Sequence, residues 1–178
     1  KVINSNGAAT DYGYNLDGLR TSVAYYRDAT PIYTNYSYYL NHLLETTDYP
    51  GFSGRNTTTN TYDGNGNLLT KLDANGNTIS YGYDNNNRLT SKQADRLTVY
   101  AYDAVGNVLA TTINNAPDTS NEYDQFNRLV TANDNKYSTK TLLYGYYEDG
   151  TRSAMTDTAN AIAVTYTYDK AKRLWVVK

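Results

Sequence analysis

One short phrase recurs along this chain and constrains its fold more than any other feature. The phrase has seven positions: tyrosine, aspartate, two variable residues, glycine or asparagine, asparagine or arginine, and an aliphatic residue. A sequence that repeats at a nearly fixed period predicts a tandem array, because each unit buries its faces against its neighbours. The copies that keep this pattern best begin at Tyr62, Tyr83, Tyr102, Tyr123 and Tyr168.

The spacing of the copies predicts two strands in each repeat. With Tyr146 of a less regular copy included, successive motif tyrosines from Tyr62 to Tyr168 lie 21, 19, 21, 23 and 22 residues apart. A second turn phrase occupies residues 72–77, and a weaker one occupies residues 157–160. A strand every ten or eleven residues leaves no room for crossover helices, so the connections should be antiparallel.

The local chemistry agrees with a sheet of hairpins. Asparagine and glycine tolerate the positive φ angles of tight turns, and a turn aspartate can accept neighbouring backbone N–H groups. Asn65-Gly66 and Asn75-Gly76 are the clearest hairpin turns, and alternating stretches such as residues 164–168 favour strands. The predicted fold class is all-β, with tandem β-hairpin repeats of about 21 residues forming a continuous, twisted antiparallel sheet.

The motif residues are assigned structural roles. Tyrosines are expected to act as packing rungs, since a phenol buries a large ring while its hydroxyl can still reach water or a backbone carbonyl. These are Tyr14, Tyr62, Tyr83, Tyr102, Tyr123, Tyr146 and Tyr168. The turn positions are Asp63, Gly66, Asn67, Asp73, Gly76, Asp84, Asp103, Gly106, Asp124, Gly150 and Asp169, and the arginines of the turn exits are Arg88, Arg128, Arg152 and Arg173.

Three stretches can be distinguished within one repeat module. Residues 1–23 hold a degenerate N-terminal copy that keeps paired tyrosines but loses the usual aspartate placement, and residues 61–178 form the regular array. Residues 24–60 are an insertion or a degenerate repeat, in which residues 40–46 could form a short helix. Both ends would leave a strand edge to be covered, so we expect a segment of a longer array or a subunit that pairs end to end.

The recurring phrases closely resemble the YD or Rhs repeats, as in Tyr62-Asp63-Gly64-Asn65-Gly66-Asn67-Leu68 and Tyr83-Asp84-Asn85-Asn86-Asn87-Arg88-Leu89. This family includes bacterial Rhs proteins, wall-associated and contact-dependent toxins, cage-forming subunits of Tc insecticidal toxins, and animal teneurins. The resemblance implies a spiralling β-sheet that forms a hollow shell, which in the toxins encloses a C-terminal effector. The chain has no Asp-Pro-x-Gly segment, so the family's self-cleavage is not expected of any residue here.

Composition excludes several classes of partner and chemistry. The net charge of −2 and the pI near 5.3 do not provide the basic surface that phosphate-backbone binding requires, so no nucleic acid partner is expected. No stretch of about 18 apolar residues is present, so no membrane insertion is expected. The absence of cysteine rules out disulfides, thiolate zinc sites and cysteine nucleophiles.

No residue is predicted to be catalytic, to bind a metal or to bind a cofactor. Asp73, Asn75 and Asn77 with Asp84 superficially suggest a calcium loop, but the glycine and glutamate that an EF-hand needs are replaced by Thr78 and Asp84. His42 has no second histidine as a partner, and Glu148 and Asp149 are adjacent, which in a strand points them to opposite sides.

Two functions are compatible with these features. The first is a non-enzymatic wall segment of an extracellular or secreted shell, which encloses, displays or delivers another domain, with flanking repeats and an enclosed effector domain as partners. The alternative is a filament-forming or cell-surface adhesion module, which joins copies of itself or binds glycans or proteins through its tyrosines. The chain has 21 tyrosines against two phenylalanines and one tryptophan, so exposed rings could stack on sugars.

Overall fold

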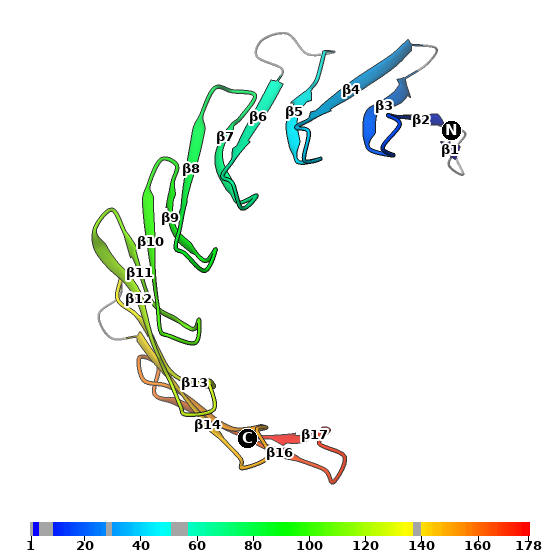
Figure 1. The fold of residues 1–178 in the computed structure, drawn as a ribbon. Helices are drawn as coiled ribbons and strands as arrows, with labels where there is room; N and C mark the ends of the chain where they lie inside the picture. The colour runs from blue at the N-terminus through cyan, green and yellow to red at the C-terminus, as the bar shows by residue number, and fades with distance from the viewer. Residues whose placement is uncertain (1, 4–8, 28–29, 51–56, 137–139) are drawn as a thin grey trace. The chain divides into compact units, whose positions relative to one another are not determined.

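The structure is a computed structural model that describes residues 2–3, 9–27, 30–50, 57–136 and 140–178. Every regular element in these ranges is a β-strand, so none of the described residues belongs to a helix that could cross a membrane (Figure 1). The chain divides into two compact units, residues 1–87 with 92–94, and residues 88–91 with 95–178. The sequence boundaries proposed at residues 23 and 60 both fall inside unit 1.

Unit 1 is an antiparallel meander in which each strand pairs with the one that follows it along the chain. Its strands are β1 (Val2–Ile3), β2 (Ala9–Tyr14), β3 (Arg20–Arg27), β4 (Thr30–Tyr38), β5 (Leu44–Asp48), β6 (Thr57–Tyr62), β7 (Leu68–Leu72) and β8 (Thr78–Tyr83).

Unit 2 repeats the same plan, again with every pair antiparallel. Its strands are β10 (Leu97–Tyr102), β11 (Val108–Ile113), β12 (Ala116–Tyr123), β13 (Leu129–Asp134), β14 (Lys140–Tyr146), β15 (Arg152–Asp157), β16 (Ile162–Tyr168) and β17 (Leu174–Val177). Strand β9 (Leu89–Gln93) contributes residues to both units. The predicted all-β fold of tandem antiparallel hairpins is confirmed.

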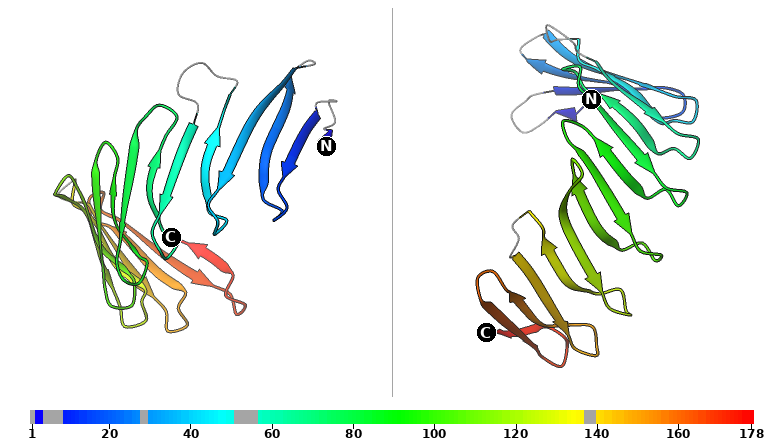
Figure 2. Two further views of the ribbon diagram at one scale, coloured as in Figure 1. Left: turned by 45° about the horizontal axis from the view of Figure 1, so that its top comes forward. Right: turned by 90° about the vertical axis from the view of Figure 1, so that its left-hand side faces the viewer.

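Motif hairpins share a bulge that sequence reasoning did not anticipate. In the β6–β7 hairpin, Tyr62 pairs with Leu68 whereas Thr61 pairs with Thr70, so Leu69 is an extra residue in the exit strand. The same shift occurs beside the motif tyrosine in hairpins β2–β3, β4–β5, β10–β11, β12–β13, β14–β15 and β16–β17. A bulge increases the local twist of its strand. Within each unit the motif turns lie along one edge of the sheet (Figure 2).

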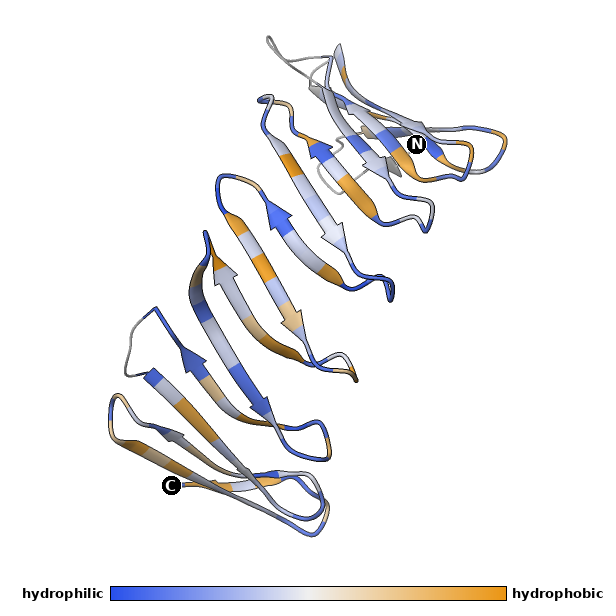
Figure 3. Ribbon diagram, turned by 60° about the vertical axis from the view of Figure 1, so that its left-hand side comes forward, coloured by the Kyte–Doolittle hydropathy of each residue, from blue (hydrophilic) through white to orange (hydrophobic). Residues whose placement is uncertain are grey.

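Few of the described residues are fully buried. Val23 and Ala24 are the buried apolar residues, and Thr47 and Asn60 are the buried polar ones. Polar and apolar residues alternate along most strands (Figure 3), whereas β17 carries only apolar side chains. A sheet with so thin an apolar interior must draw much of its stability from hydrogen bonds between hairpins.

The structure corrects the prediction of a short helix at residues 40–46. Residues 44–46 belong to β5, and a turn that ends with His42 at φ 66° connects β4 to β5. Tyr38 pairs with Leu44 as Tyr62 pairs with Leu68. A seven-residue run is too short to hold a helix by itself, and pairing with β4 and β6 determines its conformation instead.

Candidate functional site: the motif turns and the contacts between copies

In the copies that keep an aspartate at position two, this aspartate holds the turn. In the β6–β7 turn, Oδ1 of Asp63 accepts the backbone N–H groups of Asn65 and Asn67, both at 2.9 Å. Its Oδ2 accepts the side-chain amide of Asn67, also at 2.9 Å. The backbone N–H of Gly66 donates to the Asp63 carbonyl at 3.1 Å. The carboxylate therefore satisfies donors that the hairpin's own ladder leaves unbonded.

The turn has three loop residues, and only the last of them has a positive φ angle. Gly66 has φ 86°, whereas Asn65 is not among the residues with positive φ. This is a type I turn followed by a left-handed residue, the usual three-residue hairpin loop. The predicted position of the turn at Asn65-Gly66 is thus correct, although the asparagine is not left-handed. Position five is left-handed in the other copies too, as with Asn87 at 61° and Asn127 at 60°.

These hydrogen bonds hold the pKa of the turn carboxyls below the ordinary value. The side-chain amides of Asn67 and Asn77 are the main cause for Asp63 and Asp73 respectively. At Asp103, partial desolvation opposes the shift, but hydrogen bonds from Asn107 and the turn backbone outweigh it. The same downward direction applies to Asp124, Asp149, Asp157 and Asp169. These carboxylates are stabilised in their charged form, which fits turn caps better than general acids.

The motif tyrosines connect each copy to the copy before it. The hydroxyl of Tyr83 donates to the Leu68 carbonyl at 3.1 Å, and that of Tyr146 donates to the Leu129 carbonyl at 2.8 Å. In every such bond the acceptor is position seven of the preceding copy. The other members of the series are Tyr38 to Arg20, Tyr62 to Leu44, Tyr102 to Leu89 and Tyr123 to Val108.

The pairing between hairpins explains why a phenol is needed at this place. Strand β13 pairs with β14 only from Thr131, which lies opposite Leu143, to Asp134. Leu129 is therefore outside the backbone ladder to the next hairpin, and the Tyr146 hydroxyl supplies a donor to its carbonyl. A phenylalanine would fill the same space without this hydrogen bond. This geometry accounts for the excess of tyrosine over phenylalanine at the motif positions.

Arginine at position six joins the turns of successive copies. The guanidinium of Arg88 lies 4.8 Å from the centre of the Tyr102 ring and donates to the Asp103 carbonyl at 2.9 Å. Arg128, in the copy that begins at Tyr123, repeats this arrangement on the following copy, 4.6 Å from the centre of the Tyr146 ring and 3.2 Å from the Tyr147 carbonyl. Each arginine thus covers the motif tyrosine of the following copy.

Asparagine at position six makes a different contact. The side-chain amide of Asn67 donates to Oδ1 of Asn87 at 2.7 Å, and that of Asn107 donates to Oδ1 of Asn127 at 3.2 Å. In both pairs the acceptor is the left-handed residue at position five of the next copy. The turns of one edge are therefore linked by side chains as well as by strand pairing.

The structure places the predicted motif residues as follows. The seven tyrosines end strands β2, β6, β8, β10, β12, β14 and β16, and in five of these copies an aspartate begins the turn. Asp73 and Gly76 form an equivalent turn between β7 and β8. Gly106 and Gly150 are left-handed at φ 103° and 87°. Arg173 bonds to Asp169 in its own turn, and Arg152, at position seven, covers Tyr144 instead, 4.7 Å from the ring centre.

Sequence reasoning left one motif copy undecided between an insertion and a degenerate repeat, and it did not anticipate how another is capped. Residues 38–44 form a hairpin with the motif register, although Tyr39 replaces the aspartate and no signal of the phrase survives except the tyrosine and the final leucine. In the N-terminal copy, Asn15 takes the place of the aspartate, and its Oδ1 accepts the backbone N–H groups of Asp17 and Leu19. An amide oxygen can serve this role because the bonds need only an acceptor.

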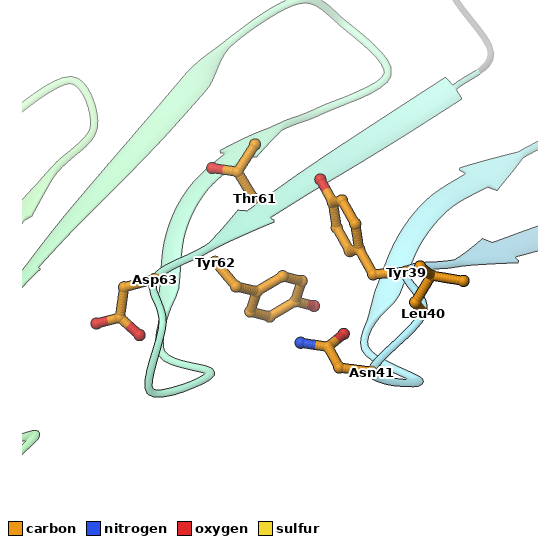
Figure 4. Close-up of a pocket in the computed structure, with 6 residues that line it drawn as sticks. All are labelled: Tyr39, Leu40, Asn41, Thr61, Tyr62 and Asp63. Carbon is orange, nitrogen blue, oxygen red and sulfur yellow. The ribbon is translucent and has the colours of Figure 1, made fainter.

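Two open clefts occur where the second motif position is a tyrosine. One, in unit 1, has a volume of about 430 Å³ and is lined by Tyr39, Leu40, Asn41, Thr61, Tyr62 and Asp63 (Figure 4). The other, in unit 2, has a volume of about 560 Å³ and is lined by Tyr147, Glu148, Asp149, Thr151, Thr167, Tyr168 and Asp169. We name them cleft 1 and cleft 2.

The described residues show no arrangement suited to metal or nucleophilic chemistry. No group of three or more histidine, aspartate and glutamate side chains gathers among them at metal-binding distance. His42 contacts Asp17 at 3.9 Å, and both side chains are more than half exposed. This exposed contact does not form a protected catalytic pair of the kind that nucleophile activation needs.

Comparison with known proteins identifies the class of repeat. Residues 62–96 match the family model described as RHS Repeat. This segment is therefore an Rhs repeat, as the sequence resemblance predicted. A comparison with curated proteins gave no match.

Comparison with solved structures shows a common fold with Tc toxin chains. A crystal structure of TcdB2-TccC3 without its hypervariable C-terminal region superposes with a TM-score of 0.74 at 16% identity, covering 96% of this chain and 10% of that chain. A structure of TcdB2-TccC3-Cdc42 gives 0.61 at 19% identity, with 98% and 12% covered. A Tc holotoxin pore from Photorhabdus luminescens gives 0.58 at 19% identity, with 97% and 12% covered. This chain spans about a tenth of the length of the chains it matches.

Proposed function

We propose that this chain is a non-enzymatic wall segment of a secreted or cell-surface Rhs-repeat shell, which encloses, displays or delivers another domain. The observation that carries the proposal is the tyrosine bond that six successive motif copies, from Tyr38 to Tyr146, make to position seven of the copy before them. These bonds extend the sheet by one hairpin at a time and leave each hairpin dependent on its neighbours. The described residues provide rigid turns and hydrogen-bonded rungs, which suit a wall.

The likeness to TcdB2-TccC3 structures supports this role, since nearly the whole chain superposes on a small part of a much larger chain. A wall made of many such hairpins would separate an interior from solvent. Its partners would then be flanking repeats and an enclosed effector domain. The same likeness supports a secreted bacterial setting as part of the proposal, because the Tc holotoxin is a Photorhabdus luminescens protein.

Limited proteolysis of the full-length natural polypeptide tests the wall role. Segments outside residues 1–178 that are enclosed by the wall should resist protease in the intact protein. Substituting Tyr102 and Tyr146 by alanine should open the wall and make those segments cleavable, while Tyr14→Ala, in the first copy, should leave them protected. Enclosed segments that are cut equally fast in the unaltered protein and in the double variant would rule out enclosure.

Self-assembly is the second candidate, and the last strand favours it. Strand β17 exposes Leu174, Trp175 and Val177, at 55%, 74% and 53% respectively. An exposed apolar strand edge is a template for another strand. Light scattering with electron microscopy across a concentration range separates the two roles. Growth into filaments that Trp175→Lys abolishes would establish assembly, and a monomer at all concentrations would exclude it.

A further inference from the structure

Clefts 1 and 2 arise from the same departure from the motif. In both, the second motif position is tyrosine, and its ring meets the next motif tyrosine edge to face. The ring centres of Tyr39 and Tyr62 are 6.0 Å apart at 90°, and those of Tyr147 and Tyr168 are 6.4 Å apart at 87°. Figure 4 shows the first pair with Asn41 beside it. The second-position tyrosine also donates to the backbone, Tyr39 to Asn60 and Tyr147 to Tyr166, both at 3.0 Å.

The turn cap moves when tyrosine replaces the aspartate. At cleft 1, Oδ1 of Asn41 accepts the backbone N–H of Leu43 at 3.3 Å. At cleft 2, Oδ1 of Asp149 accepts the backbone N–H of Thr151 at 3.0 Å. Both caps stand at position four, so two copies far apart in the sequence rebuild the turn in the same way. The clefts are therefore a repeated structural type and do not result from one irregular turn.

Each cleft is lined by a motif tyrosine, Tyr62 or Tyr168. At Tyr102 and Tyr146, an arginine of the preceding copy covers the ring of the motif tyrosine. Arg88 lies over the Tyr102 ring and donates to the Asp103 carbonyl. Arg128 likewise lies over the Tyr146 ring and donates to the Tyr147 carbonyl. The guanidinium seat thus consists of a motif tyrosine ring and the carbonyl of the next residue. In the clefts, the corresponding pairs are Tyr62 with Asp63 and Tyr168 with Asp169.

The chain supplies no guanidinium from position six to either cleft. Position six is Leu43 before cleft 1 and Thr151 before cleft 2. Leu43 nevertheless occupies the equivalent place, since its Cδ1 lies 3.7 Å from the Cβ that Gly66 would carry. Arg88 Nη1 lies 4.0 Å from the corresponding point at Gly106. At cleft 1, an apolar side chain from position six therefore stands where the regular copy has a guanidinium, and position six supplies no cation.

The charges that line the clefts favour a cation. Asp63 lines cleft 1, and Glu148, Asp149 and Asp169 line cleft 2, while neither lining includes lysine or arginine. Two of the three acids of cleft 2 already have a cationic partner: the Nζ of Lys172 lies 3.5 Å from Oδ2 of Asp149, and the Nε of Arg173 lies 2.7 Å from Oδ2 of Asp169. An aromatic ring beside a carboxylate binds a guanidinium through its face and through charge.

We propose that each cleft binds the guanidinium of an arginine side chain from a second polypeptide segment. The incoming arginine would lie on Tyr62 or Tyr168 and donate to the carbonyl of Asp63 or Asp169, as Arg88 and Arg128 do within the chain. The partner is thus a basic peptide that presents single arginines. Binding at these clefts is independent of the wall role, because each seat lies within one unit and needs no flanking repeat.

Fluorine NMR of the 178-residue chain labelled with fluorotyrosine tests the proposal. The probe is the capped peptide acetyl-Gly-Arg-Gly-amide, compared with the same peptide containing citrulline, which keeps the shape but lacks the charge. Signals are assigned with Tyr62→Phe and Tyr168→Phe. The arginine peptide should shift both signals, and the citrulline peptide should bind about fivefold to tenfold more weakly.

Variants that supply an internal guanidinium give the decisive control. Leu43→Arg should abolish the response of Tyr62 alone, and Thr151→Arg should abolish that of Tyr168 alone. Ala104→Arg, which adds the same charge at a turn away from both clefts, should leave both responses unchanged. Equal binding of the citrulline peptide, shifts caused by methyl glucoside and not by the arginine peptide, or no shift at all would each overturn the proposal.

Discussion

Replacing a rung tyrosine by phenylalanine removes one oxygen and leaves the ring in place, and the chain offers a matched pair for this test. The Tyr146 hydroxyl donates to the Leu129 carbonyl at 2.8 Å. The Tyr123 hydroxyl donates to the Val108 carbonyl at 3.1 Å, but that carbonyl also accepts the side-chain amide of Asn121 at 3.0 Å. Tyr146→Phe therefore takes away the side-chain donor described for its acceptor, whereas Tyr123→Phe leaves a second donor in place.

The magnitudes follow from the energetics of a hydrogen bond in a half-buried site. A net protein hydrogen bond contributes about 1 kcal/mol, and an acceptor left without a partner adds to the loss. Tyr146→Phe should lower the free energy of unfolding by about 1 to 1.5 kcal/mol, and Tyr123→Phe by about 0.5 kcal/mol. For a chain of this length, about 1 kcal/mol corresponds to a shift of roughly 2 to 4 °C in melting temperature.

Urea unfolding followed by circular dichroism measures both losses, and hydrogen exchange of β13 and β14 shows whether the loss is local. Tyr102→Phe should behave like Tyr146→Phe, and Tyr62→Phe should behave like Tyr123→Phe, since Asn60 donates to the same Leu44 carbonyl at 3.2 Å. Tyr14→Phe, at an exposed motif tyrosine of the first copy, is the control and should cost nothing measurable. Equal losses in all four rung variants, or none, would refute the account of the rungs as carbonyl donors.

Three further perturbations test the turns. The turn aspartates have lower pKa values in the folded chain than the ordinary 3.8, so their contribution to stability is complete above that pH and is lost as the pH falls through the folded-state values. The urea midpoint should therefore fall steeply below about pH 4, with a shallower fall in Asp73→Asn; an unchanged midpoint in acid would contradict the role of these caps. Gly106→Ala places a side chain at φ 103° and should cost about 1 to 2 kcal/mol in urea unfolding, whereas Ala104→Gly in the same turn should cost less. Arg128→Lys keeps the charge but loses the planar contact with Tyr146 and should cost about 1 kcal/mol by the same assay, and a neutral result would remove the ring contact from the account.

The strands and turns of the regular copies could be predicted because their signals are local. Asp63 and Gly66 stand within one turn, where an acceptor at the start and a left-handed residue before the exit are both recognisable in sequence. The alternating stretch that ends at Tyr168 likewise reads as a strand, and β16 covers it. The periodic spacing then required hairpins, since nothing else joins strands so close together.

Other features escaped prediction because they depend on residues in neighbouring copies. Nothing near Tyr146 in the sequence reveals that its hydroxyl meets the Leu129 carbonyl, 17 residues earlier. The hairpin that contains Tyr39 was left undecided because its aspartate is absent, and the ring contact with Tyr62 that replaces it spans two copies. The helix expected at residues 40–46 failed for the same reason, since strand pairing on both sides overrides a short local preference.

The contacts between turns also impose an order on the copies. An asparagine at position six needs an acceptor side chain at position five of the next copy, as Asn107 finds in Asn127, and a glycine there would supply none. An arginine at position six needs only a ring and a carbonyl, as Arg128 finds at Tyr146, and tolerates glycine at position five of the next copy, as Gly150 shows. Copies of the Gly-Asn type are therefore suited to precede copies of the Asn-Arg type. In the two copies where position six is Leu43 or Thr151, the tyrosine at position two contacts the next motif tyrosine edge to face, and an open cleft remains beside each pair of rings.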